Sequence, residues 1–177
     1  KFIPSQRMEE IELSWLVKKK KEVFSVLREH PLLYSSFLIS FFSDAWRLLN
    51  ESKELFHQAG KMANIVEART KWVNAIVNAG TCLETLLTIL YFVTRKHAPL
   101  KEYTIGDFLA ELENDVKSFG RETLSDLNFV KELRNKCAHY RAYDDLSGAT
   151  EIDEIKTLMA LSRAEMFFGI MKSYLRE

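Results

Sequence analysis

The chain has 177 residues, of which 47% are hydrophobic, so a single domain of this length can bury a substantial core. Its 25 Lys and Arg residues balance its 25 Asp and Glu residues, which argues against recruitment of nucleic acid by a global positive field but leaves room for a local cationic cleft. With only six Gly and three Pro residues, the chain lacks the turns of an all-β fold. Long segments between these few breakers predict an all-α fold.

The cysteines and the apolar stretches predict the compartment. Cys82 and Cys137 have neither the spacing of a zinc site nor the number for a disulfide framework, so we expect two packed thiols in a reducing cytoplasm. The apolar stretch 32–49 is interrupted by Ser, Asp and Arg residues and is too polar for a membrane span. We therefore expect a cytoplasmic protein with no membrane partner.

Apolar residues at helical spacing predict three helices in the first half of the chain. They cover about 6–30, 32–58 and 61–96, and Gly60 suits the C-terminal cap of the second helix. The third helix contains Gly80, although a glycine inside a helix costs about 1 kcal/mol relative to alanine. We therefore expect another helix to cross closely at this position.

The second half of the chain predicts three further helices. Thr104 and Asp107 have capping-box spacing at the start of a helix that ends at Gly120. A fifth helix covers about 123–140, and a last helix follows a loop and covers about 151–175. The last helix is expected to bury one side, made of Ile152, Ile155, Met159, Met166, Ile170 and Tyr174. The three tryptophans lie on apolar stripes and are expected in the core: Trp15, Trp46 and Trp72.

Together these elements predict an antiparallel bundle of helices with two parts. Residues 61–177 would form the helical domain itself, and residues 1–60 would form an N-terminal helical extension packed on the bundle.

The fifth helix separates a core stripe from a polar stripe. At about 100° per residue, Val130, Leu133 and Cys137 share the core side, and Tyr140 falls close to it. A polar stripe runs beside it, with the small Ala138 in its middle, and consists of Asn128, Lys131, Arg134, Asn135 and His139. Asn135 and His139 are four residues apart, so their side chains can touch.

These polar residue types suit the cleavage of a phosphodiester. The guanidinium of Arg134 can grip a phosphate, the imidazole of His139 can give or take a proton, and the amide of Asn135 can hold the imidazole in one tautomer. Since no carboxylate lies on this stripe, metal-assisted chemistry is not favoured, and we expect neither metal ligands nor a cofactor. Spacing alone leaves a structural role open, because basic residues near the end of a helix also cap its last carbonyls.

The segment 133–139, Leu-Arg-Asn-Lys-Cys-Ala-His, resembles the motif of HEPN domains. These domains are helical bundles in which an Arg is followed, after four to six residues, by a His near the end of a late helix, often with Asn directly after the Arg. The segments 80–86 and 104–109 are also similar to the layout of these domains. The resemblance covers roughly 61–175 and implies a HEPN-like bundle.

The resemblance implies a metal-independent endoribonuclease. Active family members dimerise so that two motifs face each other, and they cut RNA with the 2′-hydroxyl as the internal nucleophile. Carried over, Arg134 would bind the scissile phosphate, His139 would act as general acid or base, and Asn135 would orient one of them. Lys131 and Asn128, on the same stripe, are expected to bind the RNA substrate.

Other functions stay open at this point. Many HEPN domains are inactive, so a non-catalytic module that binds nucleotide, RNA or a partner protein is one alternative, and a purely structural dimerisation domain is another. Family analogy also implies a defence or toxin system with an antitoxin or regulatory partner. One subgroup carries a Tyr two residues after the His, where this chain has Arg141, and Tyr140 comes directly after His139. Exposure of Arg134 and His139 in a cleft shared by two chains would favour the ribonuclease.

Overall fold

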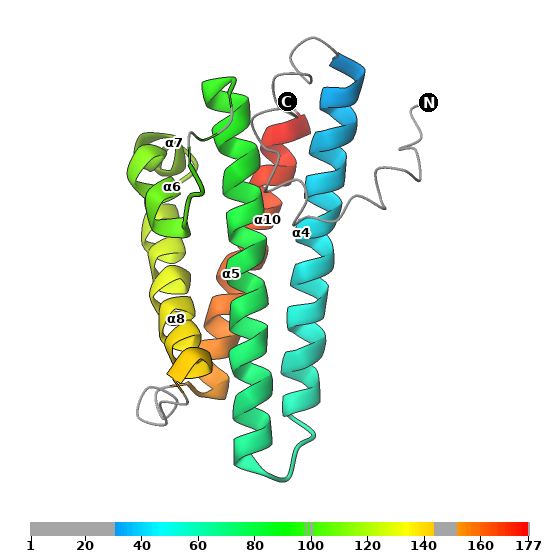
Figure 1. Cartoon of the computed structure of the whole chain (residues 1–177), viewed down its shortest axis with the longest axis vertical. Helices are drawn as coiled ribbons and strands as arrows, with labels where there is room; N and C mark the ends of the chain where they lie inside the picture. Colours follow the sequence, from blue (N-terminus) through cyan, green and yellow to red (C-terminus); the bar gives the residue numbers. More distant parts are fainter. Residues whose placement is uncertain (1–30, 98, 100, 144–151, 177) are drawn as a thin grey trace.

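The computed structural model describes residues 31–97, 99, 101–143 and 152–176, and these residues form six α-helices and no strand (Figure 1). The helices are α4 (Pro31–Ala59), α5 (Ile65–Arg95), α6 (Ile105–Glu111), α7 (Glu113–Ser118), α8 (Thr123–Tyr143) and α10 (Glu154–Arg176). The prediction of an all-α helical bundle is confirmed. The helix predicted over 6–30 lies outside the described residues.

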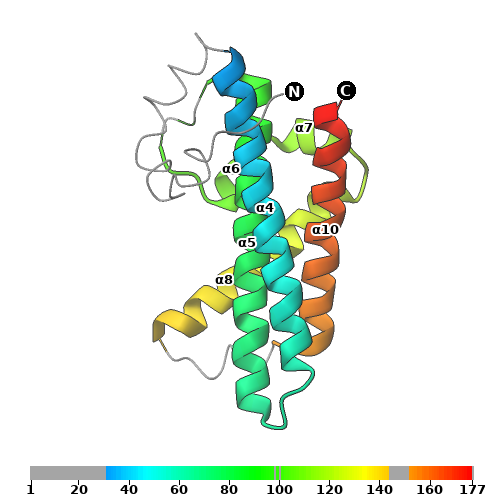
Figure 2. The same ribbon diagram turned by 90° about the vertical axis from the view of Figure 1, so that its right-hand side faces the viewer.

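Helix α5 occupies the centre of the bundle, with α4 and α10 running along it and α8 crossing it obliquely (Figures 1 and 2). One hydrophobic core joins these helices, and it includes Leu49 of α4, Ile76 of α5 and Phe167 of α10. A buried hydrogen bond adds to the packing of α4, since Ser52 Oγ donates to the carbonyl of Ala75 at 2.9 Å. Helix α4 therefore shares its core with the rest of the bundle, and a domain boundary at residue 60 stays a prediction.

Helix α5 begins four residues later than the sequence pattern predicts. The side chain of Asn64 accepts a hydrogen bond from the backbone N–H of Val66 at 2.8 Å and so caps the helix at this point. Ile65 and Val66 are more than half exposed, which shows that the apolar stripe becomes a core face only further along. Gly60 has no positive φ, whereas Lys96 takes the left-handed conformation after α5 with φ 62°.

The helix predicted from residue 105 to 120 is two short helices, α6 and α7. Its start is confirmed: Thr104 and Asp107 form a complete capping box, with both reciprocal hydrogen bonds present. The helix ends at Glu111 because Leu112, with φ −102° and ψ 15°, leaves the helical conformation. The fully buried side chain of Leu112 anchors this break in the core.

The predicted buried side of α10 is confirmed in part, since Ile170 and Tyr174 are half-buried against the core. Ile155 is 71% exposed, Met159 is exposed, and Met166 is 60% exposed. The side that packs on the bundle includes small residues, which let the helices approach closely, and it consists of Thr157, Ala160, Leu161, Ala164, Phe167, Phe168 and Met171. Ile152, just before the helix, is buried as predicted.

The prediction that the tryptophans lie in the core is also confirmed only in part. Trp72 is buried as predicted, whereas Trp46 is 47% exposed and covers the ring of Phe168, with 5.1 Å between the ring centroids. Trp15 lies outside the described residues.

Helix α5 is the one described helix that is long and apolar enough to cross a membrane, with a mean hydropathy of 1.6 over its most apolar window. Other parts of the bundle bury 72% of that window. Length and composition alone are weak evidence for a span, and this degree of burial is typical of the core helix of a soluble protein.

Candidate functional site

Helix α8 presents the two faces that its sequence predicts. Val130, Leu133 and Cys137 are buried in the core, whereas Asn135 and Ala138 are exposed. The side chain of Tyr140 lies outside the described residues. Burial of the apolar stripe therefore orients the helix and leaves the residues beside that stripe at the surface.

A contact with α10 fixes the first half of α8. Arg163 Nε donates to Asp126 Oδ1 at 3.0 Å, and the Arg163 guanidinium carbon lies 4.1 Å from the ring centroid of Phe129. Both Arg163 and Asp126 are about three-quarters buried, so the pair is better shielded from water than an exposed surface pair. Helix α10 thus fixes the position of α8, which carries the polar stripe.

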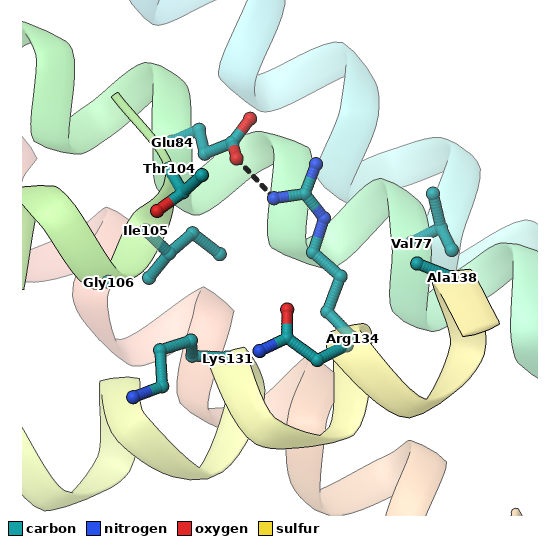
Figure 3. A pocket seen from close by; sticks show the side chains of 9 residues that line it. Val77, Glu84, Thr104, Ile105, Gly106, Lys131, Arg134 and Ala138 are labelled. Atoms are coloured by element: carbon teal, nitrogen blue, oxygen red, sulfur yellow. Dashed lines mark hydrogen bonds and ion pairs between the residues drawn. The ribbon is translucent and has the colours of Figure 1, made fainter. Parts of the chain in front are cut away.

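A cleft of about 750 Å³ opens between α5, α8 and the start of α6 (Figure 3). Its lining consists of Val77, Glu84, Thr104, Ile105, Gly106, Lys131, Arg134, Asn135 and Ala138. Three of the five predicted site residues, Lys131, Arg134 and Asn135, therefore meet in one cleft.

The two other predicted site residues differ from these three. Asn128 is half-buried and does not line the cleft, because it lies about one turn before Lys131 on α8. The side chain of His139 lies outside the described residues, but its position in α8 directly follows Ala138, which lines the cleft. The C-terminal end of α8, which carries His139, extends past the edge of the bundle (Figure 2).

Gly80 lies under the side chain of Arg134. A Cβ atom at position 80 would come within 2.9 Å of Arg134 Cγ, within 3.0 Å of Nε, and closer still to Cδ. Real Cβ atoms essentially never approach other atoms this closely, so the absence of a side chain at Gly80 makes room for Arg134. The prediction that a helix crosses closely at Gly80 is confirmed only in part, because the atoms nearest to Gly80 belong to the Arg134 side chain of α8 and not to the backbone of a crossing helix.

Glu84, one turn after Gly80 on α5, binds the guanidinium of Arg134. Nη1 of Arg134 donates to Glu84 Oε1 across the cleft (Figure 3). The side chains of Arg134 and Glu84 are 23% and 27% exposed, so the pair is partly buried but open to the cleft. The site therefore contains a carboxylate that the polar stripe of α8 does not show.

The sequence carries a signal for Glu84 that inspection of α8 alone misses. Gly80 and Glu84 are four residues apart on one face of α5. The glycine leaves space for a side chain from a neighbouring helix, and the glutamate can bind a positive charge at the tip of that side chain. The signal becomes specific only when the partner is known, and Arg134 is 50 residues away in sequence.

The start of α6 forms the third wall of the cleft. The Asp107 carboxylate accepts hydrogen bonds from the backbone N–H and the hydroxyl of Thr104, each at 2.9 Å. These bonds, the backbone one first, lower the pKa of Asp107 below its usual value. The capping box thus fixes Thr104 and Gly106 in the wall opposite α8.

The charges of the cleft are mixed. Lys131 is half-buried and its Nζ lies 3.2 Å from Glu132 Oε1, while Arg134 is paired with Glu84. Glu132 is largely exposed, so water and salt screen its hold on Lys131, and an incoming anion can compete for that ammonium group. The described residues contain no group of three or more His, Cys, Asp or Glu side chains that could hold a metal ion.

Both cysteines are buried thiols, as the sequence predicts. Burial, helped by the charge of Asp44, raises the pKa of Cys82 to about 12, so this thiol stays protonated and is a poor nucleophile. Cys137 is fully buried on the core face of α8. Neither residue faces the cleft, so thiol chemistry plays no part at the site.

Comparison with known proteins gives no match: the chain fits no family model, no curated protein and no solved structure. The resemblance of residues 133–139 to the HEPN motif therefore stays a prediction. The geometry adds an independent observation, because Lys131, Arg134 and Asn135 line a single cleft of the chain.

Proposed function

We propose that this protein is a metal-independent endoribonuclease of the HEPN type, and that RNA binds in the cleft at Arg134. The observation that carries the proposal is the convergence of Lys131, Arg134 and Asn135 on one open cleft of about 750 Å³. A volume of about 300–1,000 Å³ is usual for small-molecule pockets, so a nucleotide unit fits. Lys131 and Arg134 outnumber the one carboxylate in the lining, Glu84, so the cleft favours the negative charge of a phosphodiester.

The proposed reaction is an internal transesterification. The 2′-hydroxyl oxygen attacks the adjacent phosphorus and loses its proton, the bond from phosphorus to the 5′-oxygen breaks, and that oxygen leaves with a proton. The products are a 2′,3′-cyclic phosphate and a 5′-hydroxyl. Arg134 would stabilise the extra negative charge on the non-bridging phosphate oxygens, His139 would transfer one of the protons, and Asn135 would orient the imidazole or the phosphate. Lys131 would hold the RNA backbone beside the cut.

The proposal includes a homodimer across the end of α8. One Arg and one His do not surround a phosphate from both sides, and a two-fold axis supplies a second set from the same sequence. From the sequence pattern we predict that this surface includes Leu127, Lys131, Arg134 and Ala138, but Leu127 is fully buried inside the chain and is therefore excluded. By family analogy, the enzyme would act in the cytoplasm in a defence or toxin system, restrained by an antitoxin or regulatory partner.

A second candidate function has one observation in its favour. Because Glu84 already satisfies the charge of Arg134, the ion pair would also suit a non-catalytic HEPN-like module that binds nucleotide, RNA or protein. The two candidates differ in turnover, since the module would bind RNA and leave it intact.

Cleavage of matched substrates tests the proposal. Purified protein should cut single-stranded RNA equally well with and without EDTA, and mass spectrometry should find a 2′,3′-cyclic phosphate on the upstream fragment. The same oligonucleotide with 2′-deoxyribose should stay intact, because it lacks the nucleophile. Cleavage of the deoxy substrate, or loss of activity on chelation, would contradict the mechanism, and binding without cleavage would favour the module.

A further inference from the structure

We propose that Gly80 and Glu84 of α5 form a cradle that positions the Arg134 guanidinium for the substrate phosphate, which makes Glu84 a positioning residue of the site. The inference rests on the proposed function and deepens it, because it adds a second helix to the machinery that the motif on α8 supplies. Its evidence is the path of the Arg134 side chain, which starts on α8 and passes over Gly80. Figure 3 shows that side chain ending at Glu84 of α5.

The first part of the cradle is steric. Because a Cβ atom at position 80 would lie 2.9 Å from Arg134 Cγ, the middle of the arginine side chain occupies the space beside the α5 backbone. Gly80 is itself buried inside the longest helix of the bundle, where glycine lowers helix stability. The room that it provides for Arg134 accounts for a glycine at this unfavourable position.

The second part of the cradle is electrostatic. Nη1 of Arg134 donates to Glu84, and a guanidinium carries five N–H donors in a fixed plane. A single bond at Nη1 holds that plane in place and leaves donors on the same group for a phosphate. A flexible arginine would have to be ordered when RNA binds, whereas a held arginine meets the transition state without that loss.

The position of the pair favours positioning over a purely structural role. The side chains of Glu84 and Arg134 both line the cleft, and about a quarter of each remains exposed there. The Arg163–Asp126 pair is shielded from water to a similar degree but lies outside this cleft, so shielding alone does not separate the two roles. What distinguishes the Glu84–Arg134 pair is its place in the lining of the cleft. Its consequence lies in where it places the cationic group.

Variants of Gly80 and Glu84 distinguish two roles of the Glu84 carboxylate: it positions Arg134 for the phosphate, or it blocks Arg134 from binding the phosphate. Gly80→Ala crowds the Arg134 side chain and leaves the Glu84 carboxylate in place. Glu84→Ala removes the carboxylate, and Glu84→Gln keeps an oxygen that can still accept from Nη1. The matched control is Gly169→Ala, a substitution inside α10 at a glycine that has no other atoms within 4 Å of its would-be Cβ. The experiment measures kcat and KM for RNA cleavage, with a melting curve for every protein.

We expect kcat to fall in Gly80→Ala and Glu84→Ala, with little change in KM. Misplacing a reacting group by about 1 Å can cost about 100-fold in rate, so Gly80→Ala and Glu84→Ala should lose about that factor. Glu84→Gln should recover part of it, and Gly169→Ala should match wild type. Melting close to wild type for Glu84→Ala would show that the loss is not unfolding.

Three results would overturn the inference, and they are distinguishable. If wild type cuts RNA and Gly80→Ala and Glu84→Ala cut as fast, the cradle is wrong while the proposed function stands. If Glu84→Gln cuts faster than wild type, the carboxylate blocks the site and does not position it. If wild type cuts no RNA at all, the proposed function fails and the inference falls with it.

Discussion

The side chain of Arg134 lies across Gly80, so closely that an alanine Cβ at position 80 would come within 2.9 Å of the arginine Cγ. This relationship ties the motif helix α8 to the core helix α5 and gives a reason for a glycine in the middle of a long helix. It also places the arginine in a cleft with Lys131 and Asn135.

A charge on the core face of α8 should unfold the bundle. Cys137 is fully buried on the same face of α8 as Val130 and Leu133, so Cys137→Asp should lower the free energy of unfolding by about 3 kcal/mol or more. Asn135→Asp introduces the same residue on the exposed side of the same helix and should change stability by only about 0.5 kcal/mol. Denaturant unfolding of both variants measures the difference, and equal stabilities would contradict the orientation of α8.

The thiol of Cys82 should resist alkylation in the native protein. Its pKa is raised to about 12 by burial, so at pH 8 the reactive thiolate is roughly 2,000-fold rarer than in an unfolded chain, where the pKa is about 8.5. Iodoacetamide labelling followed by mass spectrometry should modify Cys82 in guanidinium chloride and leave it unmodified in buffer over the same time. Rapid labelling of the native protein at this residue would show that the core of α5 is open.

The capping box of α6 should make part of the stability depend on acid. The pKa of Asp107 is lowered in the folded protein, so its ionised form stabilises the fold above the unfolded value of about 3.9, and this contribution is lost as the pH falls through the folded pKa. The Tm difference between wild type and Asp107→Asn should therefore be larger at pH 7 than at pH 3. A difference that stays constant or grows on acidification would contradict the role of the carboxylate.

Much of the fold could be predicted from local patterns. The boundaries of α4, the capping box at Thr104 and the core stripe of α8 each depend on residues within a few positions of one another, and each is present. The face of α10 could not be predicted in the same way, because apolar residues occur on several of its sides. Its neighbours select the side with Ala160 and Ala164, where close approach is possible, and leave Ile155 and Met166 in water.

The candidate site could be predicted only on one of its walls. The spacing on α8 brings Lys131, Arg134 and Asn135 together, since all three are on one helix. Glu84 comes from another helix, and its contact with Arg134 depends on how α8 crosses α5, which local spacing does not determine. Asn128 is on the same stripe but does not line the cleft. The extent of the cleft along α8 also depends on where α5 and α6 pack against that helix, which local spacing does not determine.

The proposed ribonuclease should be a dimer in solution. The surface around Lys131 and Ala138 would meet its copy across a two-fold axis and bring two motifs to one cleft. Light scattering coupled to size-exclusion chromatography should give twice the chain mass at micromolar concentration. A monomeric mass under these conditions would contradict the shared site.

Cleavage of RNA by matched arginine and histidine variants tests the central claim most directly. Arg134→Ala and His139→Ala remove the proposed phosphate-binding and proton-transfer groups, and Arg121→Ala and His57→Ala remove the same residue types at exposed positions away from the cleft. The first two variants should lose about 100- to 10,000-fold in rate. A melting curve for each variant separates loss of activity from loss of the fold, because Arg134 is also paired with Glu84. The two control variants should cut like wild type. Normal cleavage by both Arg134→Ala and His139→Ala, or a wild type that leaves every RNA intact, would contradict the account.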